Sequence, residues 1–219
     1  MVEIATSILT VEEDQSTETF YNLEAAGTDY FHIDIMDGKF VEKDTQDLMY
    51  KYTSIIKKIS NLPLDVHFMV EDIKAGIDQY LSLEPSIITF HYEACENDDE
   101  VLEYIRYINE NSVKAGLSIK PETDVEKIKK FLPLLHLLLV MTVEPGKGGQ
   151  KMIPETVEKV RELKEYIDEK ELGTYIEVDG GVNNETVHLV KEAGAEILVA
   201  GSAVISALDF KEAIETLKE

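Results

Sequence analysis

Three strand-like segments of this chain place polar side chains at alternate positions, and this pattern limits the folds that the chain can adopt. The segments run from Tyr30 to Met36, from Leu64 to Met69 and from Glu177 to Asp179. Because alternate side chains of a strand share one face, each segment has a polar face opposite its Ile, Val or Phe residues. This arrangement is typical of a closed parallel barrel, where helices cover the apolar outer face and the strand ends line a pocket.

The polar positions of these segments hold residues that bind metals: His32 and Asp34, Asp65 and His67, Glu177 and Asp179. Imidazole and carboxylate groups near strand ends are typical ligands of divalent ions, so we predict a divalent metal site. Asp65 and Glu177 have two interpretations. They are either hydrogen-bond partners that orient the site or an ion pair at the barrel bottom. His91, at the end of a further expected strand, is a candidate to line the pocket.

Short β-branched runs alternate with amphipathic, charge-rich stretches along the whole chain. The expected strands are Ile4–Ile8, Tyr30–Met36, Leu64–Val70, Ser86–Tyr92, Ala115–Lys120, His136–Val143, Tyr175–Asp179 and Ile197–Ala200. Helical patterns such as Glu155–Glu169 and Asn184–Glu192 lie between them, and Gly27 and Gly194 are expected to end helices. No linker composition interrupts the alternation, so we predict an α/β protein with a single-domain (β/α)8 TIM barrel over residues 1–219. An open doubly wound sheet shows the same alternation, but polar inner faces favour closure.

The composition excludes several classes of partner. The chain has 44 acidic and 21 basic residues, which gives a formal net charge of -23. Nucleic acids and anionic membranes bind cationic surfaces, so neither is expected as a partner. Cys95 is the only cysteine, which excludes an intrachain disulfide and favours a reducing compartment. Because no segment resembles a leader or a membrane span, we expect a cytoplasmic protein.

Glycine-containing segments follow the last expected strands. They are Glu144 to Gln150, Asp179 to Gly181 and Ala200 to Ser202. Glycines allow backbone N–H groups to approach an anion closely, and a helix that begins beyond Ser202 would add partial positive charge. The last strands of TIM barrels frequently form a phosphate site. We therefore predict that backbone donors hold a phosphate in this acidic protein.

Several short motifs occur in order over nearly the whole chain. They are Ser7-Ile8-Leu9, His32-Ile33-Asp34-Ile35-Met36-Asp37-Gly38, Leu64-Asp65-Val66-His67-Phe68-Met69, Met141-Thr142-Val143, Gly148-Gly149-Gln150, Glu177-Val178-Asp179-Gly180-Gly181 and Ala200-Gly201-Ser202. Together they resemble the ribulose-phosphate 3-epimerases, although each motif is weak by itself. The resemblance implies an isomerase of the pentose phosphate pathway that interconverts D-ribulose 5-phosphate and D-xylulose 5-phosphate. Two carboxylates would transfer protons through an enediolate.

The resemblance also implies roles for individual residues. One divalent ion, either zinc, iron(II) or manganese, would be held by His32, Asp34, His67 and Asp179, and Asp34 and Asp179 would also form the acid/base pair. Ser7 and His67 would contact the substrate, and its reacting centre would be walled by Met36, Met69 and Met141. The phosphate would be held by Gly146, Gly148, Gly149, Gly180, Gly181, Gly201 and Ser202. Lys147 either adds a cation beside the phosphate or is an exposed loop lysine.

Departures from the family pattern surround the mouth of the expected barrel. Thr6 replaces a usual proline, the segment from Glu42 to Asp47 replaces one that contains Pro-Asn, and Glu144 and Lys147 stand where Asn and an aromatic residue are usual. These changes spare the expected metal ligands, so the sequence indicates the chemistry more firmly than the substrate. The segment from Tyr30 to Gly38 is also similar to the allulose-6-phosphate 3-epimerases, which would use the same mechanism on a longer sugar.

Two alternatives come from other classes of protein. A non-catalytic paralogue would bind a sugar phosphate as a sensor. The other alternative is a phosphate-binding decarboxylase. Such enzymes carry an Asp-x-Lys-x-x-Asp motif at a strand end, and the segment from Asp37 to Glu42 only approximates this motif. For the main hypothesis we expect a small phosphorylated ketose as the substrate and a homo-oligomeric assembly.

Overall fold

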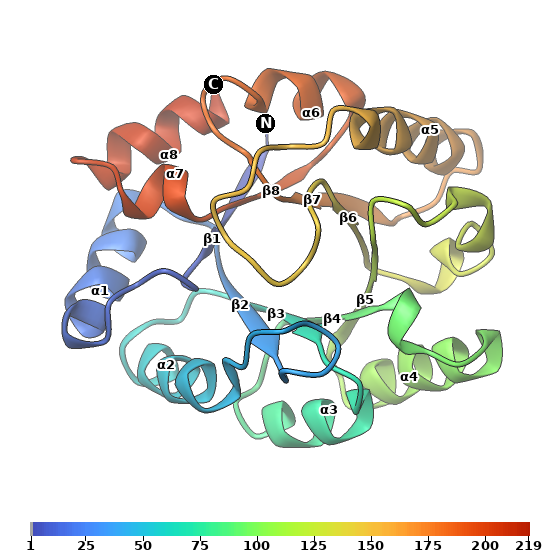
Figure 1. Cartoon of the computed structure of the whole chain (residues 1–219), viewed down its shortest axis with the longest axis horizontal. Helices are drawn as coiled ribbons and strands as arrows, with labels where there is room; N and C mark the ends of the chain where they lie inside the picture. The colour runs from blue at the N-terminus through green and yellow to red at the C-terminus, as the bar shows by residue number, and fades with distance from the viewer. Residues whose placement is uncertain (1) are drawn as a thin grey trace.

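The computed structural model describes residues 2–219, and within them eight strands close into a barrel (Figure 1). The strands are β1 (Glu3–Ser7), β2 (Tyr30–Met36), β3 (Leu64–Met69), β4 (Ile87–His91), β5 (Lys114–Ile119), β6 (Leu137–Met141), β7 (Tyr175–Asp179) and β8 (Ile197–Ala200). Consecutive strands pair in parallel, and β8 pairs with β1 to complete the ring. The expected (β/α)8 barrel is therefore confirmed, and the open sheet is excluded.

Helices form a ring outside the strands (Figure 1). They are α1 (Ser16–Ala26), α2 (Gln46–Ile59), α3 (Ile73–Leu81), α4 (Asp98–Glu110), α5 (Glu155–Glu169), α6 (Val187–Ala193), α7 (Ser202–Ile205) and α8 (Phe210–Lys218). The connection from β5 to β6 instead contains the 3-10 helices η3 (Val125–Lys127) and η4 (Leu132–Leu134). Pro133 lies in the first turn of η4, where a proline is tolerated because the N–H groups of a first turn have no partner within the helix. Within residues 2–219, each helix is too short or too polar to cross a membrane.

The ends of two helices test the sequence pattern. As predicted, Gly27 ends α1 and Gly194 ends α6, with φ angles of 89° and 104° in the left-handed region. α6 begins at Val187, later than the expected Asn184. The reason is Asn183, whose side chain accepts from Glu185 N and whose carbonyl accepts from the backbone N–H groups of Thr186 and Val187. These hydrogen bonds form a turn before the helix.

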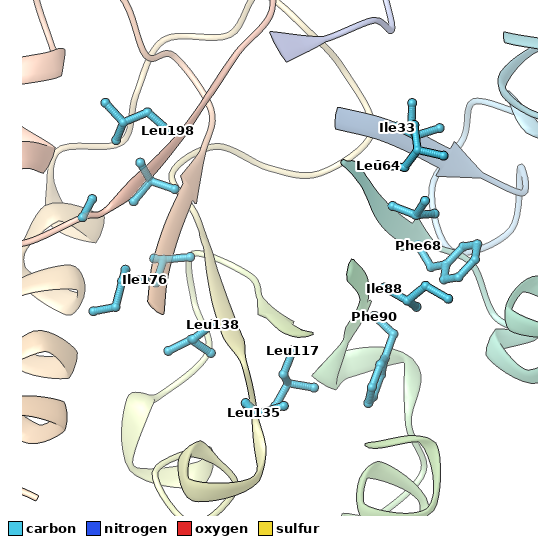
Figure 2. Packing of buried hydrophobic residues seen from close by; sticks show 14 of the residues in the cluster. Ile33, Leu64, Phe68, Ile88, Phe90, Leu117, Leu135, Leu138, Ile176 and Leu198 are labelled. Carbon is cyan, nitrogen blue, oxygen red and sulfur yellow. The ribbon is translucent and has the colours of Figure 1, made fainter. Parts of the chain in front are cut away.

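Apolar side chains form two separate layers. The larger layer lies between the strands and the helices, and Figure 2 shows part of it, including Ile33, Phe68, Phe90, Leu117, Leu138, Ile176 and Leu198. The smaller layer lies inside the barrel and consists of Ala5, Ile87, Leu137, Leu139, Met141, Val143, Ile197 and Val199. Because hydrophobic stabilisation scales with buried apolar area, most of it comes from the outer layer.

Many other inward-facing positions of the barrel carry buried polar side chains. Among them are Ser7, His32, Asp34, Asp65, His67, Thr89, His91, Ser118 and Glu177. Strand register pairs His32 with Asp65 and Asp34 with His67 across β2 and β3. The polar faces therefore point into the barrel, as the alternation in the sequence predicts.

Candidate active site

Four potential metal ligands converge inside the barrel. His32 and Asp34 come from β2, His67 comes from β3, and Asp179 ends β7. A ligand atom from each residue lies within 4.8 Å of those from the others. Nδ1 of His67 lies 3.4 Å from Asp34 Oδ1 and 3.9 Å from Asp179 Oδ2. The structure thus brings together all of the residues in the expected metal set.

The donor atoms of this cluster fit a divalent cation. His32 Nε2 and His67 Nδ1 are buried and have no hydrogen-bond partner within the part of the chain that the structure describes. Buried polar atoms are nearly always paired, so two such nitrogens beside two carboxylates indicate a cation-binding site. Mixed imidazole and carboxylate ligands suit divalent transition metals.

The opposite nitrogen of each imidazole has a buried partner. His32 Nδ1 lies 2.5 Å from Asp65 Oδ2, and His67 Nε2 lies 2.9 Å from Nε2 of His91. Contacts of this kind fix the orientation of a metal-binding imidazole. Asp65 therefore occupies an orienting position, which was one of its two interpretations. Glu177 differs, because its oxygens make no hydrogen bond among residues 2–219 and Oε1 lies 3.9 Å from His32 Nδ1.

The two carboxylates of the cluster have pKa values shifted in opposite directions. Burial opposes ionisation of Asp34, but the adjacent His32 and His67 outweigh it and hold the pKa of Asp34 well below its usual range. Burial and then the charge of Asp34 raise the pKa of Asp179 to about 6. Opposed shifts of neighbouring carboxylates are typical of acid/base sites.

A cavity of about 420 Å³ adjoins this cluster. Its lining includes the expected substrate-binding residues Ser7, Met36, Met69, Met141, Gly146, Lys147, Gly148, Gly149, Gly180, Gly181, Gly201 and Ser202, together with Asp34 and Asp179. His67, also expected to contact substrate, is fully buried and does not line the cavity. The carboxylates, rather than the imidazoles, therefore face the space where a ligand fits.

The Ser7 hydroxyl and three methionine side chains line the cavity together with Asp34. The hydroxyl of Ser7 donates a hydrogen bond of 2.7 Å to Asp34 Oδ2, which fixes this carboxylate. Met36 and Met69 are register partners on β2 and β3, and Met141 ends β6. The methionines give this part of the cavity a wall that carries no ionisable proton.

The glycine segments differ in what their glycines do. At Gly181, with φ 66°, an added Cβ would collide with Met152 N, so glycine is needed for the close packing of two segments. At Gly201, an added Cβ would meet no described atom closer than 3.5 Å. The protein itself has room for a methyl group at Gly201. A substitution at Gly201 therefore tests ligand binding without disturbing the fold, whereas a substitution at Gly181 also disturbs the fold.

The segment from Glu144 to Gln150 is closed by its own side chain. Nε2 of Gln150 donates to the carbonyl oxygens of Glu144 and Lys147 over 2.6 and 2.8 Å. The Lys147 side chain is 73% exposed, and its Nζ lies 3.7 Å from Glu42 Oε2. Its charge is therefore hydrated and has an acidic neighbour, which weakens its attraction for an anion.

Asp37, the residue that suggested a decarboxylase, has a role in loop structure. Its Oδ1 accepts hydrogen bonds from the backbone N–H groups of Lys39 and Phe40, and its Oδ2 accepts from that of Glu71. These contacts hold the connection after β2 in place. Asp37 does not line the cavity, which argues against the decarboxylase alternative.

The cavity also contains residues that the sequence analysis did not assign to it. They include Leu9, Thr10, Asn183 and Val199. Asn183 lies two positions after Gly181, so the glycine motif was a signal for it. Val199 carries no such signal, because only the barrel geometry shows that this apolar side chain faces inward.

Fold and site together define a (β/α)8-barrel enzyme whose carboxylates and glycine segments meet at one cavity. The chain belongs to the ribulose-phosphate 3 epimerase family, whose model matches residues 3–205. It is 40% identical to the ribulose-phosphate 3-epimerase of Bacillus subtilis (strain 168), over 100% of this chain and 99% of the relative. The Methanocaldococcus jannaschii protein of the same name is 37% identical over 100% of this chain and 91% of the relative. These matches confirm the resemblance.

Solved structures with lower sequence identity share the fold. A 3-hexulose-6-phosphate synthase has a TM-score of 0.73 at 15% identity, over 99% of this chain and 98% of the other. The thiamine phosphate pyrophosphorylase from Pyrococcus furiosus has a TM-score of 0.67 at 15% identity, over 99% of this chain and 93% of the other. At such identities the likeness concerns the barrel alone.

Proposed function

We propose that this protein is a metal-dependent 3-epimerase that interconverts D-ribulose 5-phosphate and D-xylulose 5-phosphate. The observation that carries the proposal is the position of Asp34 and Asp179, which reach one cavity from separate strands, β2 and β7. Support for the five-carbon substrate comes from relatives that carry the name ribulose-phosphate 3-epimerase. The six-carbon alternative, allulose 6-phosphate, has no comparable support among them.

The proposed reaction moves one proton off a carbon and another proton onto it. Inversion beside a ketone requires removal from one face and return to the opposite face, through an enediolate. Asp34, whose lowered pKa keeps it ionised, would accept the first proton. Asp179, with its pKa raised to about 6, is suited to donate the second. The two residues exchange roles when the reaction runs in the opposite direction.

We propose one divalent ion per chain, held by His32, Asp34, His67 and Asp179. Zinc, iron(II) and manganese(II) all suit these ligands. The bound ion would polarise the carbonyl and hydroxyl oxygens of the substrate as a Lewis acid. Asp65 supports the arrangement from behind by holding the ring of His32.

The remaining cavity residues would position the sugar phosphate and exclude water. Met36, Met69 and Met141 would surround the reacting carbon with side chains that exchange no protons. Backbone N–H groups near Gly148 and Gly201 would bind the phosphate, as backbone donors commonly do. This would explain how an enzyme with a net charge of -23 holds an anion.

Solvent-deuterium incorporation tests the proposed function. The metal-loaded protein is incubated in D2O with ribulose 5-phosphate and, separately, with allulose 6-phosphate. We expect deuterium at C3 and formation of xylulose 5-phosphate, with a higher kcat/KM for the five-carbon sugar. Binding without any exchange would favour the sensor alternative, and faster turnover of the six-carbon sugar would change the substrate assignment.

A further inference from the structure

His67 begins a hydrogen-bonded series that runs away from the candidate metal cluster. Its Nε2 lies 2.9 Å from His91 Nε2, and His91 Nδ1 lies 3.1 Å from Glu93 Oε2. Glu93 Oε1 accepts a hydrogen bond of 2.8 Å from the backbone N–H of Lys120 and another from the Thr123 hydroxyl. The side chains of His67 and His91 are 0% exposed. Water therefore has little access to the two imidazoles, whereas the Glu93 side chain is 18% exposed.

An aromatic side chain from another connection covers the middle of the series. The ring of Phe40, which follows β2, lies 4.9 Å from the ring of His91 between centroids. Lys120 Nζ lies 4.3 Å from the centre of the Phe40 ring. Phe40 thus packs against His91 where the barrel opens. This contact favours one orientation of the His91 ring.

The chemistry of Glu93 sets the direction of every hydrogen bond in the series. Burial opposes its ionisation, but hydrogen bonds from His91 and Thr123 outweigh it and hold the pKa of Glu93 below its ordinary value. An ionised carboxylate only accepts hydrogen bonds, so Nδ1 of His91 must carry the proton. Nε2 of neutral His91 then has a lone pair, which accepts from Nε2–H of His67. His67 consequently has its free lone pair on Nδ1.

We propose that Glu93 and His91 are positioning residues that fix the tautomer of His67 and direct the lone pair of its Nδ1 toward the metal cluster. This inference rests on the proposed function, in which His67 is a metal ligand. His67 Nδ1 lies 3.4 Å from Asp34 Oδ1, as such a ligand should. His32 has its carboxylate partner, Asp65, in direct contact, whereas His67 reaches its carboxylate through a second imidazole.

The substitution Glu93→Gln changes the direction of the hydrogen bonds in the series but leaves the shape of the side chain nearly the same. The amide oxygen of the introduced glutamine can keep the hydrogen bonds from Lys120 N and Thr123 only if the amide NH2 group faces His91. His91 Nδ1 must then accept, so Nε2 of His91 carries the proton and Nε2 of His67 must also accept. The proton of His67 moves to Nδ1, where it blocks metal binding. The opposite orientation of the amide places its NH2 group against Lys120 N–H. A nearly isosteric change therefore disrupts the site in either orientation.

Nuclear magnetic resonance of the metal-free protein with 15N-labelled histidine is the direct test. In the wild type we expect His67 to be protonated on Nε2 and His91 on Nδ1. In Glu93→Gln we expect both rings to shift toward the other tautomer. The wild-type spectrum by itself shows which tautomers His67 and His91 adopt, so the inference is tested even where the variant fails to fold. A proton on Nδ1 of His67 in the wild type would overturn the inference.

Zinc binding supplies the second readout. The dissociation constant of Glu93→Gln should rise about 10- to 100-fold, the range typical for loss of an outer partner of a metal-binding His. The matched control is Thr89→Val on β4, a buried inward residue whose hydroxyl has no partner in the described chain. This control should bind zinc as the wild type does. Unchanged zinc affinity in Glu93→Gln would contradict the proposed role. If the wild type shows the expected tautomers but has no epimerase activity, the proposed function is rejected and the inference on the tautomers stands.

Discussion

Asp34 and Asp179 lie in one buried cluster, yet the pKa of Asp34 is lowered while the pKa of Asp179 is raised to about 6. The difference follows from position. Asp34 sits between the imidazoles of His32 and His67, each 3.4 Å from its Oδ1. Asp179 is affected mainly by burial and by the negative charge of Asp34. One site thus contains a carboxylate that stays ionised and another that readily takes a proton.

Replacement of either carboxylate tests its proposed role in proton transfer. Asn is nearly isosteric and offers one oxygen to a metal, but it cannot accept and return a proton. Asp34→Asn and Asp179→Asn should each lower turnover by about 10²–10⁴-fold, the usual contribution of a general acid or base. Epimerisation and deuterium wash-in are measured from each epimer, together with metal content.

The control for both variants is Asp168→Asn, which changes an exposed carboxylate of α5 that pairs with Lys164. It should have wild-type activity. If each carboxylate serves one face, a single Asn variant should still exchange the substrate proton of one epimer without inverting the carbon. Near-normal epimerisation by a metal-loaded Asn variant would reject the mechanism with two carboxylates.

Removal of the metal should abolish activity, and metal binding should depend on pH. Elemental analysis of protein purified without chelator is expected to give one divalent ion per chain. Because Asp179 must lose its proton to act as a ligand, apparent zinc affinity should fall as the pH drops below about 6. Equilibrium dialysis between pH 5 and 8 measures this. Full turnover by protein shown to be metal-free would refute the dependence.

Asp179→Asn should stabilise the metal-free protein at neutral pH. The pKa of Asp179 is raised from 3.8 to about 6, so the folded state binds this proton more tightly than the unfolded state. The charged carboxylate therefore lowers the free energy of unfolding above pH 6, and this cost disappears as the pH falls. We expect a gain of about 1–3 kcal/mol at neutral pH. Urea unfolding at pH 7.5 and pH 4.5 tests it; an equal gain at both would exclude this cause.

Gly201→Ala should weaken substrate binding without harm to the fold. The added methyl group meets no described protein atom closer than 3.5 Å but would keep a phosphate from the backbone. Loss of one hydrogen bond to a charged group predicts a rise in KM of about 10- to 100-fold. Lys147→Ala, at an exposed side chain, should have a smaller effect. The proposal that backbone donors bind the phosphate fails if Lys147→Ala is the more harmful change. Thermal melting checks the fold of both variants.

The sequence predicted the barrel well because each strand carries its own signal. The ranges Tyr30–Met36, Tyr175–Asp179 and Ile197–Ala200 match the structure, and the longest error is two residues at the end of β6. Alternation of apolar and polar residues also identified the inward faces. The predicted helix Glu155–Glu169 also matches α5 at both ends. The predicted start at Asn184 is wrong, because hydrogen bonds of Asn183 with the residues after it delay α6 to Val187.

The sequence predicted less of the site where contacts join separate connections. The pairing of His91 with His67 depends on the register of β3 against β4, and Glu93 contacts Lys120 from another strand connection. No local pattern encodes such neighbours. The need for glycine at Gly181 likewise comes from Met152, on a different segment. The metal role, the substrate contacts, the compartment and the homo-oligomeric assembly remain predictions.

The two apolar layers have a consequence for how this protein can diversify. Side chains that hold the helices to the strands, such as Phe68 and Leu198, lie on the opposite strand face from those that shape the cavity. A substitution at Val199 or Val143 would reshape the reaction chamber and leave the outer packing in place. Evolution or laboratory selection can therefore change the lining of the cavity one residue at a time while the outer frame of the barrel stays the same.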